Sequence, residues 1–517
     1  MKKTALKILS VILCLVLALS AAIPAFAAGE KTAFIVVSGM NTFPLKLADG
    51  SNAFPPSGED TAKMVLSVTG PTLKYIIDRD YEALGNGILA PLRLYFSKLE
   101  CDNNGNSVCD VVTTEIHGSM AKNGITFEDK DQDEFALVRA GIEKFGAENT
   151  FFFNYDWRLD PLDHAEKLHD FIESVKEETS CGRIALAAYS MGGTVVCSYL
   201  YKYGSADLDS IALCSTAFQG TTSLSSLFTA DMDLSMDGLM KRLAQLTRNN
   251  TLEGLMEYIN EILNLSGVNG ALEKFANDMQ LSLKKRLYDE FITPVFGHMP
   301  GLWALVDGKS YEDAKEWMLD ENVNAALIKR ADEYHYNVQQ KADKLLKTAC
   351  ADTNIYLIAQ YNMQGLPVSE VSSTSNNDYL IDVTYASGGA VCADLGETLG
   401  SGYVQAVDCG HNHLSADGQI DASTCMFPES TWFIRDMGHV DYPYGSGTDL
   451  IITLSASEKQ LTVFSDAKYP QFLKYSYADN TLIPVEDMQE TPADAVFNVL
   501  TRITVFIFKI ASAIIGR

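Results

Sequence analysis

One serine in this sequence stands where a reversal of the chain would expose its hydroxyl group. The stretch ALAAYSMGGTVV, Ala185 to Val196, is apolar and rich in small residues, reaches Ser190, and continues with two glycines. This pattern is typical of a nucleophile elbow, a tight strand-to-helix turn from which the serine Oγ projects. The usual form is G-x-S-x-G, and Ala188 takes the place of the first glycine. Such a serine can attack a carbonyl carbon if a base and a carboxylate lie beside it.

A histidine late in the chain is the best candidate for that base. In folds with a nucleophile elbow the partners follow in the order serine, acid, histidine, and five of the eight histidines precede the region where the acid is expected. His411, His413 and His439 remain. We favour His439, because it directly follows the short aromatic strand expected over 431–434. For His411 and His413 an ordinary structural position is the better interpretation.

Three aspartates compete for the orienting carboxylate. The segment TNIYLIAQYN, 353–362, has the composition of a buried strand, and Asp378 lies in the SNNDYLIDVTYASGG segment that follows it. Asp382 lies four residues further on, and Asp417 lies 22 residues before His439. We favour Asp378 because it follows a convincing strand. Asp417 and Asp382 stay open as alternatives.

Two backbone N–H groups are expected to stabilise the oxyanion of an acyl-transfer reaction. The fold supplies one from the residue after the nucleophile and one from a loop after an early strand. These positions are Met191 and Met40, the latter following Ser38 and Gly39. Side-chain identity matters little for a backbone donor, so methionine is acceptable at both.

The elements around Ser190 alternate between strand and helix. Continuous apolar runs predict strands over 32–39, 150–157, 183–190 and 208–220, while amphipathic spacing predicts helices over 161–178 and 191–204. Such alternation is typical of a parallel sheet. We therefore expect an α/β-hydrolase fold, with a mostly parallel central sheet, helices on both faces and an inserted helical cap.

Three stretches resemble the lecithin:cholesterol acyltransferase group, which includes lysosomal phospholipase and related bacterial lipases. They are FNYDWRLDP (153–161), AYSMGGTVV (188–196) and STAFQGTTSL (215–224), and the resemblance extends from about 34 to 220. It departs at Ala188 and at Ser38-Gly39, where the group has other residues. The resemblance implies lipid-ester chemistry and aligns Asp378 with the group's acid. Asp156 and Arg158, inside the first stretch, are interpreted as a buried ion pair that supports the strand end.

Composition divides the chain into four parts. Residues 1–27 have the lysines, apolar core and A-x-A site of a secretory signal peptide. The hydrolase domain is expected over 28–455, with Met- and Leu-rich cap helices over about 222–347. A small β extension over 456–487 follows, with the pattern of a separate β meander. An amphipathic, locally cationic helix is expected over 488–517, and it suits peripheral contact with a membrane.

The overall charge and the cysteines limit the possible functions. The formal net charge is −27, or −30 once the three lysines of the leader are removed, which disfavours binding to nucleic acid. Cys101 with Cys109, and a pair among Cys392, Cys409 and Cys425, are disulfide candidates, whereas Cys197 and Cys214 suit buried free thiols. No motif indicates a cofactor or a metal ion, and nothing indicates an oligomeric state.

We therefore expect a secreted or cell-surface serine hydrolase that cleaves lipid carboxylic esters. It would act as a lipase or phospholipase, or as an acyltransferase if an alcohol takes the acyl group in place of water. The alternatives are an esterase for soluble or polymeric esters and a catalytically silent binding protein on the same fold.

Overall fold

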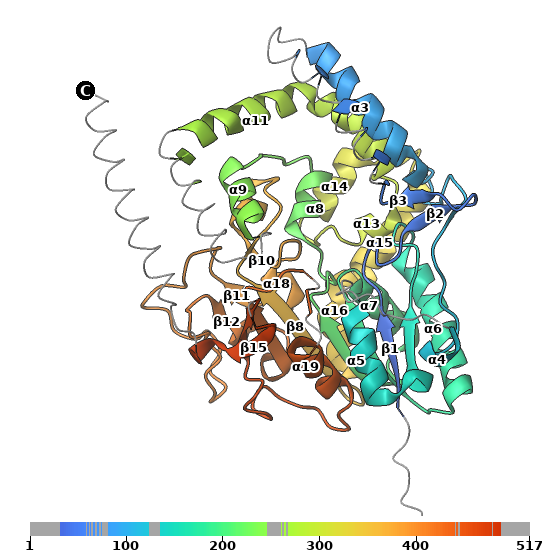
Figure 1. The fold of residues 1–517 in the computed structure, drawn as a ribbon, viewed down its shortest axis with the longest axis vertical. Coiled ribbons are helices and arrows are strands. Elements are labelled where there is room, and N and C mark those ends of the chain that lie inside the picture. Colours follow the sequence, from blue (N-terminus) through green and yellow to red (C-terminus); the bar gives the residue numbers. More distant parts are fainter. Residues whose placement is uncertain are drawn as a thin grey trace, which may run out of the picture.

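A computed structural model describes residues 32–487, except 58, 61–62, 64–65, 68–69, 72–73, 75–80, 124–134, 246–259, 261–262, 265–266, 440, 443–444 and 478. Its centre is an eight-stranded sheet in the order β15-β14-β13-β8-β7-β6-β1-β5 (Figure 1). All neighbouring strands run parallel except β14 and β15. The expected α/β class with a mostly parallel sheet is confirmed. The expected signal peptide and C-terminal helix lie outside the described residues.

The strands of the sheet agree with the apolar runs of the sequence. They are β1 (Ala33–Val37), β5 (Thr150–Phe153), β6 (Ile184–Tyr189), β7 (Leu208–Cys214), β8 (Asn354–Tyr361), β13 (Thr431–Arg435), β14 (Phe472–Ser476) and β15 (Thr481–Pro484). Strands β1 and β6 are buried along their whole length. Burial on both faces explains why these segments are uniformly apolar rather than alternating.

Helices cover both faces of the sheet. In β1, Ala33, Ile35 and Val37 belong to one core cluster, and Phe34 and Val36 belong to another. Helices α6 (Pro161–Thr179) and α7 (Gly192–Tyr203) contribute to the first cluster. Helices α5 (Ala136–Phe145) and α19 (Ser446–Ser455) contribute to the second.

Four neighbouring strands end in the same way. The residue directly after β6, β7, β8 and β13 has a positive φ: Ser190 (49°), Ser215 (48°), Asn362 (70°) and Asp436 (58°). Residues other than glycine rarely adopt this conformation, and where they do the chain turns sharply. Because these strands are parallel, all four reversals lie at the same edge of the sheet.

The long connection from β7 to β8 is helical, as expected of a cap. It contains α8 (Thr222–Phe228), α9 (Met236–Gln245), α11 (Val268–Leu287), a π-helical turn η4 (Tyr288–Ile292), α12 (Thr293–Val295), α13 (Pro300–Trp303), α14 (Tyr311–Met318), α15 (Ala325–Asn337), a 3₁₀ turn η5 (Gln339–Lys341) and α16 (Ala342–Ala349). Helix α11 packs against α3 (Tyr81–Phe96) from the N-terminal part of the chain (Figure 1). Among the described residues no helix is long and apolar enough to cross a membrane.

Short elements complete the described chain. A three-stranded sheet contains β2 (Leu45–Leu47), β3 (Asn52–Phe54) and β4 (Val111–Val112), and two further pairs join β9 (Met363–Gln364) to β10 (Asn376–Asn377) and β11 (Val391–Cys392) to β12 (Ile420–Asp421). The remaining helices and turns are η1 (Ser97–Leu99), α4 (Met120–Asn123), η3 (Ala147–Asn149), α17 (Glu370–Thr374), α18 (Val383–Ala386), η6 (Ala422–Thr424), η7 (Pro428–Ser430) and η8 (Val485–Asp487).

Two expectations about the periphery need revision. The segment 456–487 contains two strands, but they lengthen the central sheet through the parallel pair β13–β14 instead of forming a separate meander. The nine cysteines of the described residues are all free, including Cys101 and Cys109. Hydrogen bonds hold the loop between those two cysteines instead, because Asp102 Oδ1 accepts from the backbone N–H groups of Asn104 and Asn106, each at 2.9 Å. Cys197 and Cys214 are buried thiols, as expected.

Candidate active site

Ser190 occupies a tight turn between β6 and α7. Its φ of 49° reverses the chain directly after the buried strand, and α7 begins two residues later at Gly192. The small residues around it are required by space. A Cβ atom on Gly192 would lie 2.7 Å from Ser38 O, and one on Gly193 would lie 2.5 Å from Thr216 Cβ. This is the geometry of a nucleophile elbow.

His439 lies beside this serine, 249 residues further along the chain. Its Nε2 is 2.9 Å from Ser190 Oγ. The loop that carries it leaves the sheet at Asp436, directly after β13. Close packing holds the loop, because a Cβ atom on Gly438 would lie 2.5 Å from Tyr379 Cε2.

Asp378 completes the chain of contacts. Its Oδ2 is 2.8 Å from His439 Nδ1, and its other oxygen, Oδ1, accepts from the backbone N–H groups of Leu380 (3.1 Å) and Ile381 (2.8 Å). The side chain is 1% exposed. With Oδ1 held by two donors, Oδ2 is left to accept from Nδ1–H, so Nε2 keeps the lone pair that can accept the Ser190 proton.

The two rival aspartates have other partners. Asp382 accepts from the backbone N–H of Thr222 (2.9 Å) and from its hydroxyl (2.8 Å), and burial raises its pKa. Asp417 accepts from Arg435 at 2.6 Å and from the Tyr361 hydroxyl at 2.9 Å. Among the described residues, Asp378 is the aspartate that contacts His439.

The two expected oxyanion donors belong to segments that lie close to Ser190. Met191 follows Ser190 directly, and the loop that contains Met40 passes close to it, since a Cβ atom on Gly39 would lie 3.0 Å from Ser190 Cβ. Within the described part of the chain, no hydrogen-bond acceptor engages the backbone N–H of Met40 or Met191. Neither N–H group is therefore committed to another acceptor in this part of the chain, which an oxyanion donor requires.

The Tyr155–Arg158 stretch supports the site from outside the contact chain. Arg158 is fully buried and binds Asp156 through two nitrogens, Nε to Oδ1 at 3.0 Å and NH2 to Oδ2 at 2.6 Å. Its NH1 donates to Leu99 O, and its NH2 also donates to Ser107 Oγ. The buried ion pair expected here is confirmed, and it fastens the loop around residues 99–107 to the end of β5.

A contact from the inserted helices was not foreseen from the sequence. Arg242 on α9 donates to Tyr379 O at 2.7 Å and to Gln364 O at 3.1 Å, and its guanidinium lies 5.1 Å from the centre of the Tyr379 ring. Tyr379, with φ of 93°, directly follows Asp378. In the sequence, Arg242 is indistinguishable from the solvent-exposed cations that amphipathic helices commonly carry. No sequence pattern therefore identifies this contact.

A separate polar network lies at the ends of β7 and β8. The Ser215 hydroxyl donates to Gln360 Oε1 and lies 3.0 Å from the Tyr442 hydroxyl. Tyr442 stacks on Tyr189, with ring centres 5.4 Å apart. Of these residues, only Gln360 could have indicated the network from the sequence, because it is a polar residue within the apolar run of β8.

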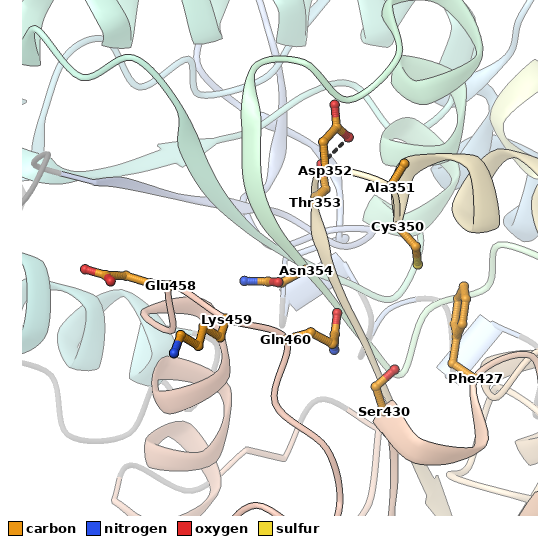
Figure 2. A pocket seen from close by; sticks show the side chains of 10 residues that line it. All are labelled: Cys350, Ala351, Asp352, Thr353, Asn354, Phe427, Ser430, Glu458, Lys459 and Gln460. Atoms are coloured by element: carbon orange, nitrogen blue, oxygen red, sulfur yellow. Dashed lines mark hydrogen bonds between the residues drawn. The ribbon is translucent and has the colours of Figure 1, made fainter.

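A pocket elsewhere on the protein is separate from these residues. It is lined by Cys350, Ala351, Asp352, Thr353, Asn354, Phe427, Ser430, Glu458, Lys459 and Gln460 (Figure 2). Asn354 begins β8 and Ser430 precedes β13, whereas Ser190, Asp378 and His439 all follow strand ends. The pocket therefore lies at the opposite edge of the parallel sheet and contains none of the candidate residues.

Comparison with known proteins adds little. No protein-family model matches the sequence, and no curated protein matches it. Among solved structures, "The crystal structure of Tle4-Tli4 complex" contains a chain that is similar over 38% of this chain and 48% of its own length, at 14% sequence identity and a TM-score of 0.19. The match spans less than half of that chain, and a similarity this low carries no weight for fold or function.

Proposed function

We propose that this chain is a serine hydrolase of the α/β-hydrolase fold that cleaves the carboxylic esters of lipids through an acyl-enzyme on Ser190. The observation that carries the proposal is the unbroken contact chain from Ser190 Oγ through both nitrogens of His439 to Asp378, at 2.9 and 2.8 Å. A nucleophile, a base and an orienting carboxylate in this order are the requirements of acyl transfer.

The reaction follows from the positions of these atoms. Ser190 Oγ attacks the ester carbonyl carbon while His439 Nε2 takes its proton, and Asp378 stabilises the imidazolium that forms. The backbone N–H groups of Met40 and Met191 stabilise the negative oxygen. His439 then gives its proton to the leaving alcohol, and water, activated by the same histidine, releases the acid. Hydrolysis is the default outcome because water is the acceptor always present.

Two features favour a lipid as substrate. The resemblance to the lecithin:cholesterol acyltransferase group is carried by the 153–161, 188–196 and 215–224 stretches. In addition, the inserted helices approach the site directly: a Cβ atom on Gly301, in α13, would lie 2.8 Å from Met191 Cε. Flexible, polarisable methionine side chains suit acyl chains of varying shape. Secretion through the leader at 1–27 belongs to the same proposal.

An active-site probe tests the chemistry. A fluorophosphonate should label the purified full-length protein, and both Ser190→Ala and His439→Ala should abolish labelling. Ser215→Ala is a matched control, because this serine follows the neighbouring strand with nearly the same φ but bonds to Gln360 and Tyr442. Labelling that survives Ser190→Ala would refute the proposed nucleophile, and a protein that no fluorophosphonate labels would support a silent binding protein.

A second experiment tests the substrate class. Rates on p-nitrophenyl esters of increasing acyl length, measured with and without liposomes, should rise toward long chains and increase at the lipid surface. A preference for short soluble esters, without any gain at the surface, would assign the protein to the esterases instead.

A further inference from the structure

A cluster of metal-binding residue types lies outside the candidate active site. Cys409, His411 and His413 each offer a ligand atom, and these three atoms lie within 4.8 Å of one another. The residues belong to the segment between β11 and β12 and alternate in the sequence as C-x-H-x-H. Thiolate sulfur and imidazole nitrogen are the ligands that Zn²⁺ prefers in proteins.

His413 is the buried member, and one of its nitrogens lacks a partner. The side chain is 0% exposed. Its Nδ1 lies 2.6 Å from Gln471 Oε1, while its Nε2 is buried with no hydrogen-bond partner among the described residues. A buried polar atom left without a partner costs about 1–3 kcal/mol, so it points to a missing ligand.

The tautomer of His413 is fixed by its neighbour. Gln471 Nε2 donates to Pro428 O at 2.6 Å and to Thr431 O at 3.2 Å, so the amide oxygen of Gln471 must face the histidine. An amide oxygen only accepts, and Nδ1 therefore carries the proton. Nε2 keeps its lone pair, as a metal ligand requires.

His411 shows the same arrangement at the surface. Its Nδ1 lies 3.4 Å from Glu429 Oε1. A histidine that binds a metal through one nitrogen commonly presents the other to a carboxylate or an amide oxygen, which orients the ring. Glu429 and Gln471 supply these two oxygens, and in both histidines Nε2 is the nitrogen left for an ion.

The loop backbone is also held in place. The Gln405 side chain accepts from the backbone N–H of His413 at 2.7 Å and donates to His411 O at 3.0 Å. His413 O in turn accepts from the backbone N–H of Ala422 at 2.9 Å. The ligands are therefore presented by a preorganised segment rather than by a free loop.

We propose that Cys409, His411 and His413 bind one Zn²⁺ ion, with a water molecule in the fourth position. This departs from the sequence-based expectation of no metal site. Zn–S distances of about 2.3 Å and Zn–N distances of about 2.0–2.1 Å require the donor atoms to approach one another by roughly 1 Å. The exposed side chains of Cys409 and His411 provide this movement by rotation, and the Cys409 thiol releases its proton to solvent on binding.

Among the described residues, the second group of metal-ligand side chains already contacts a lysine ammonium group. His169, Glu173 and Asp207 also lie close together, but Lys176 Nζ lies 2.8 Å from Glu173 and 2.7 Å from Asp207. The ammonium group pairs with both carboxylates and would repel a metal ion, so we assign no site there.

The test uses full-length protein without a histidine tag, freed of metal by a chelator and then dialysed against Zn²⁺. Elemental analysis should find one zinc per chain, and Co²⁺ in its place should give the intense absorption of a thiolate-bound tetrahedral ion. Both Cys409→Ser and His411→Gln should weaken Zn²⁺ binding at least tenfold. These exposed positions leave the fold intact, which circular dichroism checks.

Matched controls locate the ion. Cys350→Ser removes another exposed thiol and His169→Gln changes the other cluster, and neither should alter zinc content. Zinc should also raise the Tm of the parent protein, and this gain should disappear in Cys409→Ser. The proposal is overturned if the parent retains less than a tenth of an equivalent of zinc, if Cys409→Ser and His411→Gln bind it as well as the parent, or if His169→Gln removes it.

Discussion

Replacing Asp378 by asparagine tests the assignment of the acid most directly. In the parent protein Oδ1 accepts two backbone N–H groups, from Leu380 and Ile381, and Oδ2 faces His439 Nδ1 at 2.8 Å. In Asp378→Asn the amide oxygen must keep the place of Oδ1, because an NH₂ group there would face two donors. The NH₂ group then faces Nδ1 and donates to it.

This exchange reverses the tautomer of His439. Because Nδ1 now accepts a hydrogen bond, the neutral ring carries its hydrogen on Nε2, 2.9 Å from Ser190 Oγ. Nε2 can then no longer accept the serine proton. The same substitution in a serine protease lowers kcat about 10⁴-fold. We expect a loss of about 10³- to 10⁴-fold in kcat, equivalent to about 4–5.5 kcal/mol in activation free energy.

The assay is hydrolysis of a p-nitrophenyl ester that the parent protein cleaves, with kcat and KM determined separately and folding verified by thermal melting. KM should change little, because Asp378 is 1% exposed and faces the histidine. Asp417→Asn is the matched control. It breaks the contact with Arg435, so it should lower Tm while kcat stays close to that of the parent. The reasoning fails if Asp378→Asn keeps more than about a tenth of the parent kcat, or if Asp417→Asn shows the larger loss in kcat.

Three further predictions concern stability and the membrane. Arg158→Met leaves the buried Asp156 carboxylate without its cationic partner and with only the backbone N–H of residue 158 as a donor among these contacts. It should cost about 3–5 kcal/mol in the free energy of unfolding, and the double variant Arg158→Met with Asp156→Asn should recover a large part of this loss; denaturant melts measure both, and equal losses would contradict the ion-pair account. Burial raises the pKa of Asp160, the N-cap of α6, to about 6 from 3.8, so its contribution to stability is full below pH 3.8 and is lost as pH rises through 6. Asp160→Asn keeps a good cap and should therefore be more stable than the parent at pH 7.5, by about 3 kcal/mol at most, with no difference at pH 3.5; a destabilised variant at pH 7.5 would refute this. Deletion of 491–517 should abolish co-sedimentation with anionic vesicles while ester hydrolysis in solution persists, and unchanged vesicle binding would remove the proposed role of that segment.

The core elements could be predicted from the sequence because each is specified locally. An apolar run such as 184–189 can only be buried, and small residues around Ser190 indicate a turn that is confirmed by its φ of 49°. His439 could be identified from the sequence for a similar reason, because it follows strand β13 after a short loop.

The choice among the acids could not be made locally. Asp378, Asp382 and Asp417 all lie in polar, turn-rich segments, and what separates them is a partner distant in the sequence: His439 for the first, Thr222 for the second and Arg435 for the third. The partner of a strand is hidden in the same way. Strands β14 and β15 read as a separate meander because nothing in their residues shows that β14 pairs with β13.

Four neighbouring strands of the central sheet are each followed by a residue with positive φ. These residues mark where the regular geometry of the sheet ends and the connecting segments begin. After Ser215 the chain has already turned away from the central sheet, and the next strand of that sheet begins only at Asn354. What lies between these two points can change in length and composition while the ends of the strands keep their places. Relatives that share the strand ends can therefore differ widely in the intervening helices, and exchanging those helices between them is a rational route to altered selectivity.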